Sequence, residues 1–381
     1  MPSYFAVAAP GLEMFTALEL RRLALQPGAG AELQPEIGGV PFQGGLNAIY
    51  RANLRLRTAS RVLVRLGDFY AGSFSELRKK AGRLEWERYL VPGQPVAIRA
   101  TCHKSKLYHS DAVAERIAGA IADRLGKPVT RRRPADEEAE TPPQLIVARL
   151  VNDQCTLSID SSGEVLHRRG YRLAVAKAPL RETLAAGMLL ASGWDGAAPL
   201  LDPFCGSGTI AIEAALMALD APVGRMRRFA FMDWPGFEAK AWADLLADHE
   251  PRPAAGMPPI LASDRDVGAV QMARANAERA GVQHLIQFSC RAVSAIEPPA
   301  GPGWVVTNPP YGLRVSQGKD LRNLYAQLGN VLREKCPGWQ LALLCNDLKL
   351  LGQTGVKLDT SLSLINGGVA VRLGRGRVPG G

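Results

Sequence analysis

Four consecutive residues, Asn308-Pro309-Pro310-Tyr311, could hold an amino group for chemistry. They follow the apolar pair Val305-Val306, which predicts a buried strand ending at this point. An exocyclic amine would donate one hydrogen to the Asn308 side-chain oxygen and the other to the Pro309 carbonyl, which the rigid proline chain leaves without a local partner. The nitrogen lone pair would then point toward an electrophile, and Tyr311 would stack on the ring that carries the amine. A structural turn is the alternative, and this sequence is unusual for one.

A second motif, residues 200–211, predicts a strand, a glycine turn and the start of a helix. Gly206 and Gly208 let the backbone approach a ligand closely, and Thr209 can cap a helix whose N-terminus carries positive dipole. A dinucleotide site is the alternative that fits the same glycine spacing. Asp202 counts against that alternative, because an acidic residue at the mouth of the turn suits a cationic amine rather than a pyrophosphate.

Asp264 ends the next predicted strand and would accept hydrogen bonds from both hydroxyls of a ribose. In a dinucleotide fold the ribose carboxylate comes about 20 residues after the glycine turn, and Asp264 lies much further along the chain. A simple helix N-cap is the alternative role for an acidic residue here, and Asp266 fits that role better. The motifs together predict a nucleoside-type cofactor beside an amine-bearing substrate.

The residues around these motifs predict repeated strand–helix units, the pattern of a parallel sheet covered on both faces. A helix at 180–191 begins this part of the chain. The predicted strands are 199–201, 260–263, 285–289, 304–306, 340–345 and 369–373. Residues 221–259, rich in Pro, Trp and Arg, form an insertion between the first two units. We therefore expect an α/β domain of Rossmann-like type in the C-terminal half.

The first 160 residues predict a mixed α+β region made of two small modules that pack closely together. Residues 111–125 have apolar side chains at helical spacing behind a capping Ser or Asp, and strands are expected at 145–151 and 155–160. The chain as a whole has 46 Lys and Arg against 36 Asp and Glu, and residues 51–100 alone have eleven against four. A basic field of this kind suits a polyanion; a solvated surface without a partner is the alternative.

The composition also excludes several classes of protein. A hydrophobic fraction of 47% with 22% charged residues is that of an ordinary globular chain. The first fifteen residues lack Lys and Arg and include Glu13, unlike a signal peptide, and no apolar run approaches the roughly 18 residues of a membrane helix. The six cysteines and five histidines show no metal-ligand spacing. We expect a soluble, cytoplasmic, monomeric protein with reduced thiols and no metal.

The motifs at 202–209 and 308–311 resemble those of the class I S-adenosylmethionine-dependent methyltransferases that modify amino nitrogens. Further likeness narrows the family to the THUMP-domain RNA guanine-N2 methyltransferases, and in particular to the methyltransferase half of the bacterial 23S rRNA guanine-N2 enzymes. The likeness covers residues 4–375. The segments that carry it are 53–66, 73–90, 105–117, 157–172 and 178–189.

This resemblance implies a ferredoxin-like module at 1–48 that can share strands with the next part, a THUMP RNA-binding domain at 49–165, a linker at 166–180 and a Rossmann-like methyltransferase domain at 181–381. It implies S-adenosylmethionine as cofactor and structured RNA as partner. The implied cofactor-binding residues are Leu180, Thr183, Asp202, Pro203, Cys205, Gly206, Ser207, Gly208, Thr209, Asp264, Arg265 and Ala292. The implied base-binding residues are Asn308, Pro309, Pro310 and Tyr311. The basic residues expected to contact RNA are Arg55, Arg57, Arg61, Lys79, Lys80, Lys104 and Lys106.

One position departs from the family pattern. An Asp that contacts the adenine amine usually follows the third strand, and Ala292 stands there in this chain. Adenine recognition must therefore use other groups. Cys205 is expected to pack in the glycine turn and not to act as a nucleophile.

The implied reaction is direct transfer of a methyl group to the exocyclic amine of a guanosine, with 23S rRNA as the expected substrate and tRNA as the alternative. Positioning and hydrogen bonding lower the barrier, and the base must leave its stack to reach the site. A DNA adenine or cytosine amino-methyltransferase would leave residues 45–165 unexplained. A protein-glutamine methyltransferase does not suit the basic stretch, and a non-catalytic RNA-binding scaffold would not need Asp202, Asn308 and Tyr311 to be intact.

Overall fold

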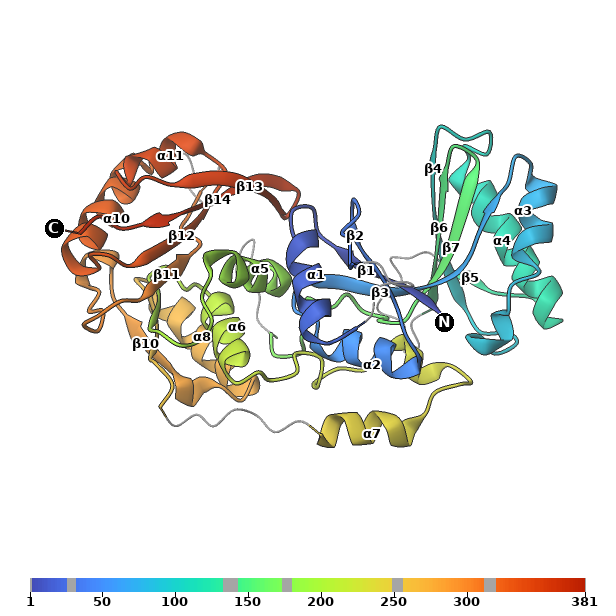
Figure 1. Cartoon of the computed structure of the whole chain (residues 1–381), viewed down its shortest axis with the longest axis horizontal. Helices are drawn as coiled ribbons and strands as arrows, with labels where there is room; N and C mark the ends of the chain where they lie inside the picture. Colours follow the sequence, from blue (N-terminus) through green and yellow to red (C-terminus); the bar gives the residue numbers. More distant parts are fainter. Residues whose placement is uncertain are drawn as a thin grey trace.

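The computed structural model describes residues 2–25, 32–132, 143–172, 180–248, 256–311 and 320–380. These residues form two seven-stranded sheets, one in the N-terminal part and one in the C-terminal domain. The molecule is elongated, with the C-terminal domain at one end, a first N-terminal module in the middle and a second module at the other end (Figure 1). No helix in the described part of the chain has both the length and the apolar character needed to cross a membrane.

The N-terminal sheet has the strand order β2-β1-β3-β7-β6-β4-β5 and runs through both small modules. The first module comprises β1 (Ser3–Ala8), α1 (Glu13–Arg22), β2 (Gly39–Gln43) and α2 (Leu46–Arg55). The second module comprises α3 (Phe74–Ala81), the 3₁₀ helix η1 (Trp86–Arg88), β4 (Val96–His103), α4 (Ser110–Leu125), β5 (Arg131–Arg132), β6 (Gln144–Val151) and β7 (Gln154–Asp160).

The long strand β3 (Ala59–Tyr70) joins the two modules. Its first part pairs antiparallel with β1, and its later part pairs antiparallel with β7, with a register shift between Arg65 and Gly67. The expected division between residues 48 and 49 falls inside α2. The two modules meet along β3, because one continuous strand supplies hydrogen bonds to both.

Among the described residues, the helices α3 and α4 cover one face of the sheet in the second module. Val113, Ile117 and Ile121 of α4 are buried against it. On β4 the opposite side chains, from Arg99 to His103, are exposed at alternate positions, as the period of a strand requires. Figure 1 shows α3 and α4 on the side away from the C-terminal domain. The open face of the second module is therefore turned toward that domain.

The C-terminal sheet has the order β10-β9-β8-β11-β12-β14-β13. Its parallel strands are β8 (Leu200–Asp202), β9 (Ile260–Asp264), β10 (Ile286–Cys290), β11 (Trp304–Thr307) and β12 (Gln340–Cys345). An antiparallel hairpin, β13 (Asp359–Asn366) and β14 (Val369–Arg377), completes one edge. The main helices are α5 (Glu182–Ser192), α6 (Thr209–Ala218), α8 (Val267–Arg279), α10 (Arg322–Lys335) and α11 (Leu348–Gln353).

The predicted fold class is confirmed: a Rossmann-like α/β domain follows two α+β modules. Strand β13 was not predicted from the sequence. Its side chains are mostly exposed and polar at alternate positions, and Leu364 is the residue that it buries most deeply. An edge strand of this kind resembles a surface loop in sequence, because only the pairing with β14 makes it a strand.

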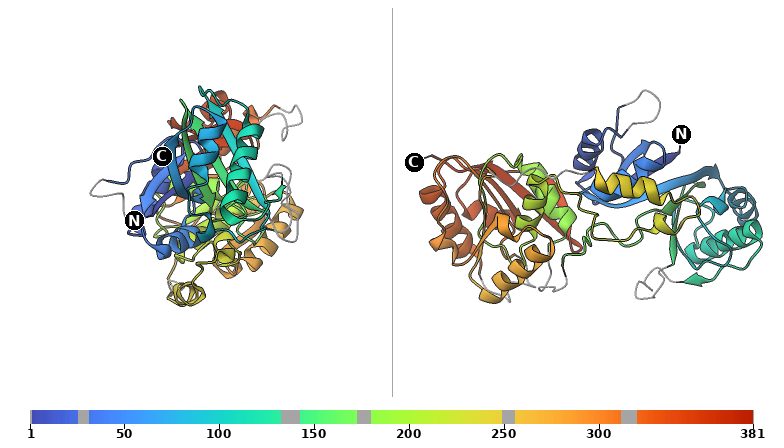
Figure 2. Two further views of the ribbon diagram at one scale, coloured as in Figure 1. Left: turned by 90° about the vertical axis from the view of Figure 1, so that its right-hand side faces the viewer. Right: turned by 90° about the horizontal axis from the view of Figure 1, so that it is seen from below.

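The insertion leaves the C-terminal domain after α6 and packs against the N-terminal modules. It contains the 3₁₀ helix η2 (Ala230–Asp233) and α7 (Ala239–Ala247). Phe229, Phe231 and Trp234 are buried in the same hydrophobic core as the residues of the N-terminal sheet. Figure 2 shows α7, in yellow, lying along the first module. The sequence located this insertion correctly but did not indicate what it contacts.

Candidate active site

The carboxyl ends of β8, β9 and β11 bring the three sequence motifs together. The strand order of the C-terminal sheet reverses between β8 and β11, and ligands of open α/β sheets bind at such a switch point. Asp202 is buried there, and the Thr307 hydroxyl donates a hydrogen bond of 2.6 Å to its Oδ1. The Gly206 N–H donates to Asp264 Oδ2 at 3.1 Å. Two carboxylates therefore line one site.

The electrostatics of this site favour a positively charged ligand. Burial raises the pKa of the Asp202 carboxyl to about 7, hydrogen bonds from Thr307 and the Phe204 N–H oppose the shift, and nearby Asp264 adds to it. These donors are neutral. A buried carboxyl group with a raised pKa is held in its charged form most effectively by a cation.

The glycine turn provides space beside these carboxylates. Gly206 has φ of +50°, and a Cβ built on it would meet no atom within 4 Å. Gly208 has φ of +84°, and a Cβ on it would lie 2.9 Å from the Cβ of Ala273 in α8. Gly208 therefore allows α6 to pack on α8, whereas Gly206 leaves open space in which a ligand fits. Both positions use a backbone conformation that glycine adopts without strain.

The sequence predicts that Thr209 caps α6, but in the structure it does not. Gly208 occupies the N-cap position, and the Thr209 hydroxyl accepts a 2.6 Å hydrogen bond from Arg172. The same guanidinium donates to the Leu180 carbonyl at 2.8 Å and pairs with Glu182 at 3.4 Å. Arg172 therefore connects the start of α5 to the glycine turn. Sequence reasoning missed this residue, because a single Arg in a basic segment carries no signal of its partners.

The neighbouring predicted cofactor residues also lie at this edge of the sheet. Pro203, Cys205 and Ser207 are buried in the turn, and Asn276 of α8 donates to the Ser207 carbonyl at 3.0 Å. Thr183 is buried in the first turn of α5. Burial raises the pKa of the Cys205 thiol, with Asp202 and Asp264 adding to the effect. A thiolate nucleophile is therefore disfavoured at this position.

At the ends of β9 and β10, Asp264 is half-buried, whereas the residues that follow it and Ala292 are exposed. Asp266 caps α8 by accepting from the Gly268 N–H at 2.8 Å, which confirms the N-cap assigned to it. Asp264 accepts from the Asp266 N–H at 3.0 Å. Arg265 and Ala292 are exposed, and the methyl side chain of Ala292 offers no polar group to an adenine. The structure assigns no substitute for the missing carboxylate.

The Asn-Pro-Pro-Tyr segment follows β11 and contains an unpaired polar atom. The side-chain oxygen of Asn308 is buried and has no hydrogen-bond partner among the described residues. The Pro310 carbonyl accepts from Tyr325 at 3.3 Å. The Tyr311 hydroxyl accepts from the amide of Asn366, on β13, at 2.8 Å. A buried acceptor without a donor is costly, so the Asn308 oxygen is suited to a ligand N–H.

Asn366 is a second residue that sequence reasoning missed, because β13 itself was not predicted. It fixes the hydroxyl of Tyr311, whose ring is partly buried between the cores of the C-terminal domain. Gly312, which continues the motif, lies outside the described residues.

The predicted RNA-binding residue Arg57 is buried, so it does not lie where RNA can reach it, and Arg55 and Arg61 are only partly exposed. Arg57 donates to the carbonyls of Leu216 and Ala221 at 3.0 and 2.7 Å, which joins the first module to the end of α6. Arg61 pairs with the buried Asp160. Arg55 is largely covered and forms an ion pair of 2.6 Å with Asp220. All three guanidinium groups therefore have partners within the protein, those of Arg55 and Arg57 at the end of α6 or just after it and that of Arg61 at the end of β7.

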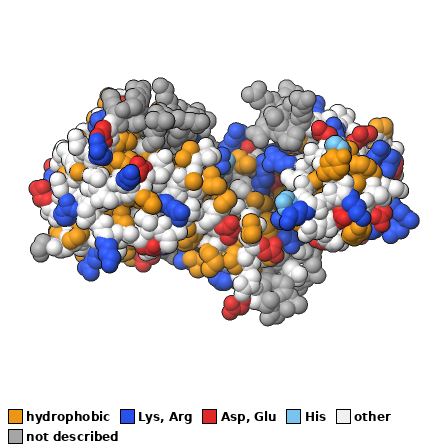
Figure 3. All heavy atoms as spheres, turned by 90° about the horizontal axis from the view of Figure 1, so that it is seen from above, with side chains coloured by type: hydrophobic (Ala, Val, Ile, Leu, Met, Phe, Trp, Pro, Cys, Tyr) orange, Lys and Arg blue, Asp and Glu red, His pale blue; other side chains and the backbone are white. Residues whose placement is uncertain are grey.

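The predicted lysines lie on the second module. Lys79, Lys104 and Lys106 are exposed, and half-buried Lys80 donates to the Tyr70 carbonyl at 2.7 Å. Arg99 on β4 and Arg149 on β6 are exposed on the open face of the sheet, where Arg149 lies opposite Thr101. Figure 3 shows Lys, Arg and His side chains over the part of the molecule that holds this module. Alternation along the predicted strand could have identified Arg149.

Family models match three successive parts of the chain. Residues 3–63 match an RlmL ferredoxin-like domain, residues 71–160 a THUMP domain, and residues 169–356 an RMKL-like methyltransferase domain. These ranges follow the first module, the second module and the C-terminal domain of the structure.

Known proteins resemble the whole chain. The Synechocystis protein slr0064, named as an RNA methyltransferase, is 35% identical over 97% of this chain and 95% of its own length. The ribosomal RNA large subunit methyltransferase K/L of Syntrophotalea carbinolica is 37% identical over 97% of this chain. The chain covers 53% of that relative, about half its length.

A solved structure also resembles the whole chain. The crystal structure of SMU.472 complexed with SAH, described as a methyltransferase, has 30% identity and a TM-score of 0.85, and the match covers 100% of this chain and 98% of that one. The same family is indicated by the arrangement of the motifs, by the three domain matches and by the similarity to these relatives. This chain belongs to the THUMP-containing, RMKL-like family of methyltransferases.

Proposed function

We propose that this protein transfers a methyl group from S-adenosylmethionine to the exocyclic N2 amine of a guanosine in structured RNA, and that the RNA is 23S ribosomal RNA. The observation that carries the proposal is the buried side-chain oxygen of Asn308, which has no partner among the described residues and lies one residue after the Thr307 that donates to Asp202. Relatives named as large-subunit rRNA methyltransferases support the choice of RNA.

The residues at the switch point fit this cofactor. Asp202 and Asp264 lie beside the open space at Gly206 and accept hydrogen bonds from the turn around it. We assign Asp202 to the cationic methionine part of the cofactor and Asp264 to its ribose hydroxyls. When bound, S-adenosylmethionine supplies an electrophilic methyl group on its positively charged sulfur.

The protein would promote the reaction by orienting the guanine amine. Asn308 Oδ1 accepts one hydrogen of the guanine amine, and we assign the second to the Pro309 carbonyl, since the Pro310 carbonyl already accepts from Tyr325. With both hydrogens engaged, the nitrogen lone pair is directed out of the ring plane toward the methyl group. Placement of this kind lowers a barrier by bringing the reacting atoms close and aligned. The proton that the nitrogen loses after transfer would pass to solvent water, S-adenosylhomocysteine would be the second product, and no covalent bond to the protein would form.

The basic second module would hold the RNA. Exposed lysines and the open-face arginines lie where phosphates can reach them, and each such contact releases counterions. The catalytic site lies at the edge of another domain, so the target base must be unstacked from a loop, bulge or helix end.

Methyl transfer from labelled S-adenosylmethionine onto separated pools of 23S rRNA, 16S rRNA, tRNA, DNA and protein tests the proposal. We expect label in 23S rRNA, and nucleoside mass spectrometry should identify N2-methylguanosine. Asn308→Ala serves as the inactive control. Label confined to tRNA would support the alternative RNA substrate, and label confined to DNA or protein would overturn the proposal.

A further inference from the structure

Near its start, the insertion contacts α2 of the first module through its backbone. The Gly224 N–H donates to the Leu54 carbonyl at 2.9 Å, and a Cβ on Gly224 would lie 2.8 Å from the Asn53 carbonyl oxygen. Such close approach excludes any larger residue at position 224. The insertion is therefore fitted to α2 from its first turn onward.

Aromatic rings continue this contact. Phe229 and Phe231 are stacked with their centroids 5.2 Å apart, and the Tyr50 ring of α2 lies 4.7 Å from Phe231. Trp242 of α7 meets Tyr50 edge-on at 5.8 Å, and the Tyr50 hydroxyl accepts from the Glu238 N–H at 3.0 Å. Aromatic pairs of this kind stabilise a packed interface by more than the burial of their apolar area accounts for.

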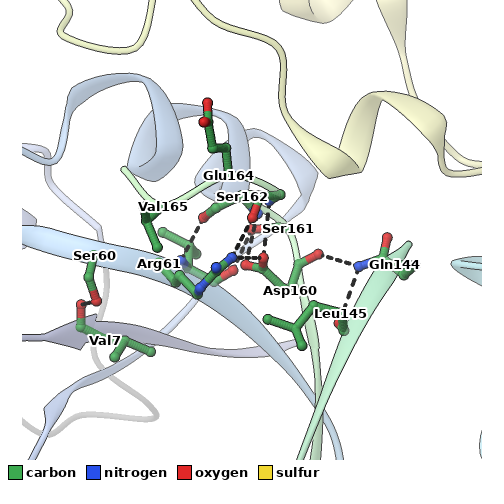
Figure 4. A network of polar contacts seen from close by, with 12 residues as sticks. Val7, Ser60, Arg61, Gln144, Leu145, Asp160, Ser161, Ser162, Glu164 and Val165 are labelled. Carbon is green, nitrogen blue, oxygen red and sulfur yellow. Dashed lines mark hydrogen bonds and ion pairs between the residues drawn. The ribbon is translucent and has the colours of Figure 1, made fainter. Parts of the chain in front are cut away.

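The insertion also holds the segment that follows β7. Asp160, the last residue of β7, is fully buried, pairs with Arg61 and accepts from the Ser162 N–H at 3.0 Å (Figure 4). Arg227 of the insertion donates to the carbonyls of Val165 at 2.7 Å and Arg168 at 3.1 Å, and also to those of Ser162 and Glu164. One guanidinium thus satisfies four carbonyls of the connection between the THUMP domain and the catalytic domain.

Trp234 extends the contact to the THUMP domain itself. Its indole N–H donates to Oε1 of Gln144 at 2.9 Å, and its ring meets Tyr89 edge-on at 5.0 Å. Gln144 in turn donates to the Asp160 carbonyl at 2.7 Å, as Figure 4 shows. Trp234 is buried. A residue of the catalytic domain's insertion therefore packs directly on the base of the THUMP sheet.

We propose that the insertion acts as a strut that sets the tilt of the THUMP domain relative to the catalytic site, with Trp234 and Arg227 as positioning residues. In the described part of the chain the THUMP domain also meets the first module along β3, whose register shift between Arg65 and Gly67 is a point where a strand can bend. The contacts of Trp234 with Gln144 and Tyr89 form a second connection to the THUMP domain, in addition to that strand. The strut thereby fixes the span between the RNA-binding face and Asn308.

This inference rests on the proposed function for its activity readout, but its structural readout does not. A displacement of the THUMP domain alters where a long RNA presents its base, and a misplacement of about 1 Å can cost about 100-fold in rate. A short RNA hairpin held mainly by the catalytic domain is insensitive to that tilt.

The test compares Trp234→Ala with Trp234→Phe, which keeps a ring in the site, and with Arg228→Ala as a matched control. Arg228 lies in the same insertion, is exposed and pairs with Asp233 within it. Tyr89→Ala removes the same ring contact from the THUMP side. Circular dichroism selects the variants that fold, so that the inference can be tested from either side of the contact.

Spin labels at Lys127→Cys in the THUMP domain and Glu278→Cys in the catalytic domain, with Cys102 and Cys290 replaced by Ser, report the distance between the domains. We expect a narrow distance distribution for the wild type, Trp234→Phe and Arg228→Ala, and a broad one for Trp234→Ala and Tyr89→Ala. Unchanged distributions in both alanine variants would overturn the inference, whether or not the protein methylates RNA.

The activity readout uses 23S rRNA and a short hairpin excised around the methylated guanosine. Trp234→Ala should lower kcat/KM on 23S rRNA by about 10- to 100-fold while its rate on the hairpin stays within about twofold of wild type. Cofactor affinity should not change. Equal losses on both RNAs would show that Trp234 supports the catalytic domain and would contradict a positioning role.

Discussion

Replacing Asp202 with Asn should stabilise the free protein above pH 7 and weaken its binding of S-adenosylmethionine. Burial raises the pKa of this carboxyl from 3.8 to about 7. At about 1.4 kcal/mol for each pH unit, this shift corresponds to about 4 kcal/mol. Asn keeps the oxygen to which Thr307 donates but carries no charge, so the variant avoids this cost.

The sign follows from proton linkage. Between pH 3.8 and about 7 the folded protein binds a proton on Asp202 that the unfolded chain has released. The contribution of this group to the free energy of unfolding therefore falls as pH rises through that window and is constant above it. In the Asp202→Asn variant this contribution disappears.

Cofactor binding should show the opposite preference. A cationic ligand favours the ionised carboxylate, so affinity should rise with pH up to about 7, and binding near pH 6 should release a proton. A hydrogen bond to a charged group contributes about 1.5–3 kcal/mol, so Asp202→Asn should weaken binding by roughly 10- to 150-fold. Titration calorimetry in buffers of different ionisation enthalpy measures both the affinity and the proton release.

Denaturant unfolding of both proteins at intervals from pH 5 to 8 completes the test, with Asp266→Asn as a matched control. Asp266 is an exposed helix cap that follows β9 at the same edge of the sheet, and its substitution should change stability by about 1 kcal/mol or less. The reasoning is refuted if the wild type and Asp202→Asn have parallel pH profiles, or if the variant binds the cofactor as tightly as the wild type.

Three further predictions concern other residues. Asn308→Ala should leave cofactor affinity unchanged in calorimetry while methyl transfer falls by about 100-fold or more; an equal loss of cofactor binding would show a structural role. Arg57→Ala should lower the free energy of unfolding by about 3–5 kcal/mol, because it leaves Glu19 and Glu213 with less compensation and removes hydrogen bonds to two carbonyls; an unchanged unfolding midpoint would contradict the buried role. Lys79→Ala with Lys104→Ala should weaken RNA binding and reduce its salt slope by about one for each lost phosphate contact, as filter binding at several salt concentrations can measure; unaltered slopes would place both lysines off the RNA.

Much of the catalytic domain was predictable because its signals are local. A strand that ends in Asp202 and a glycine turn specifies a backbone conformation within a few residues, and the strand before Asn308 does the same. Parallel strands place their carboxyl ends at one edge of a sheet. Once the strand–helix pattern was recognised, the three motifs had to lie near one another, and the structure confirms that Asp202, Gly206 and Asp264 are connected.

The tertiary structure decided which basic side chains are free and what the insertion does. Arg57 and Lys79 are equally basic in sequence, but Arg57 is buried against the end of α6, more than 150 residues away along the chain. Trp234, Tyr89 and Gln144 likewise meet only in the folded protein. The type and local spacing of residues determine the elements and their motifs. Burial and partners depend on contacts between distant segments, which no local pattern encodes.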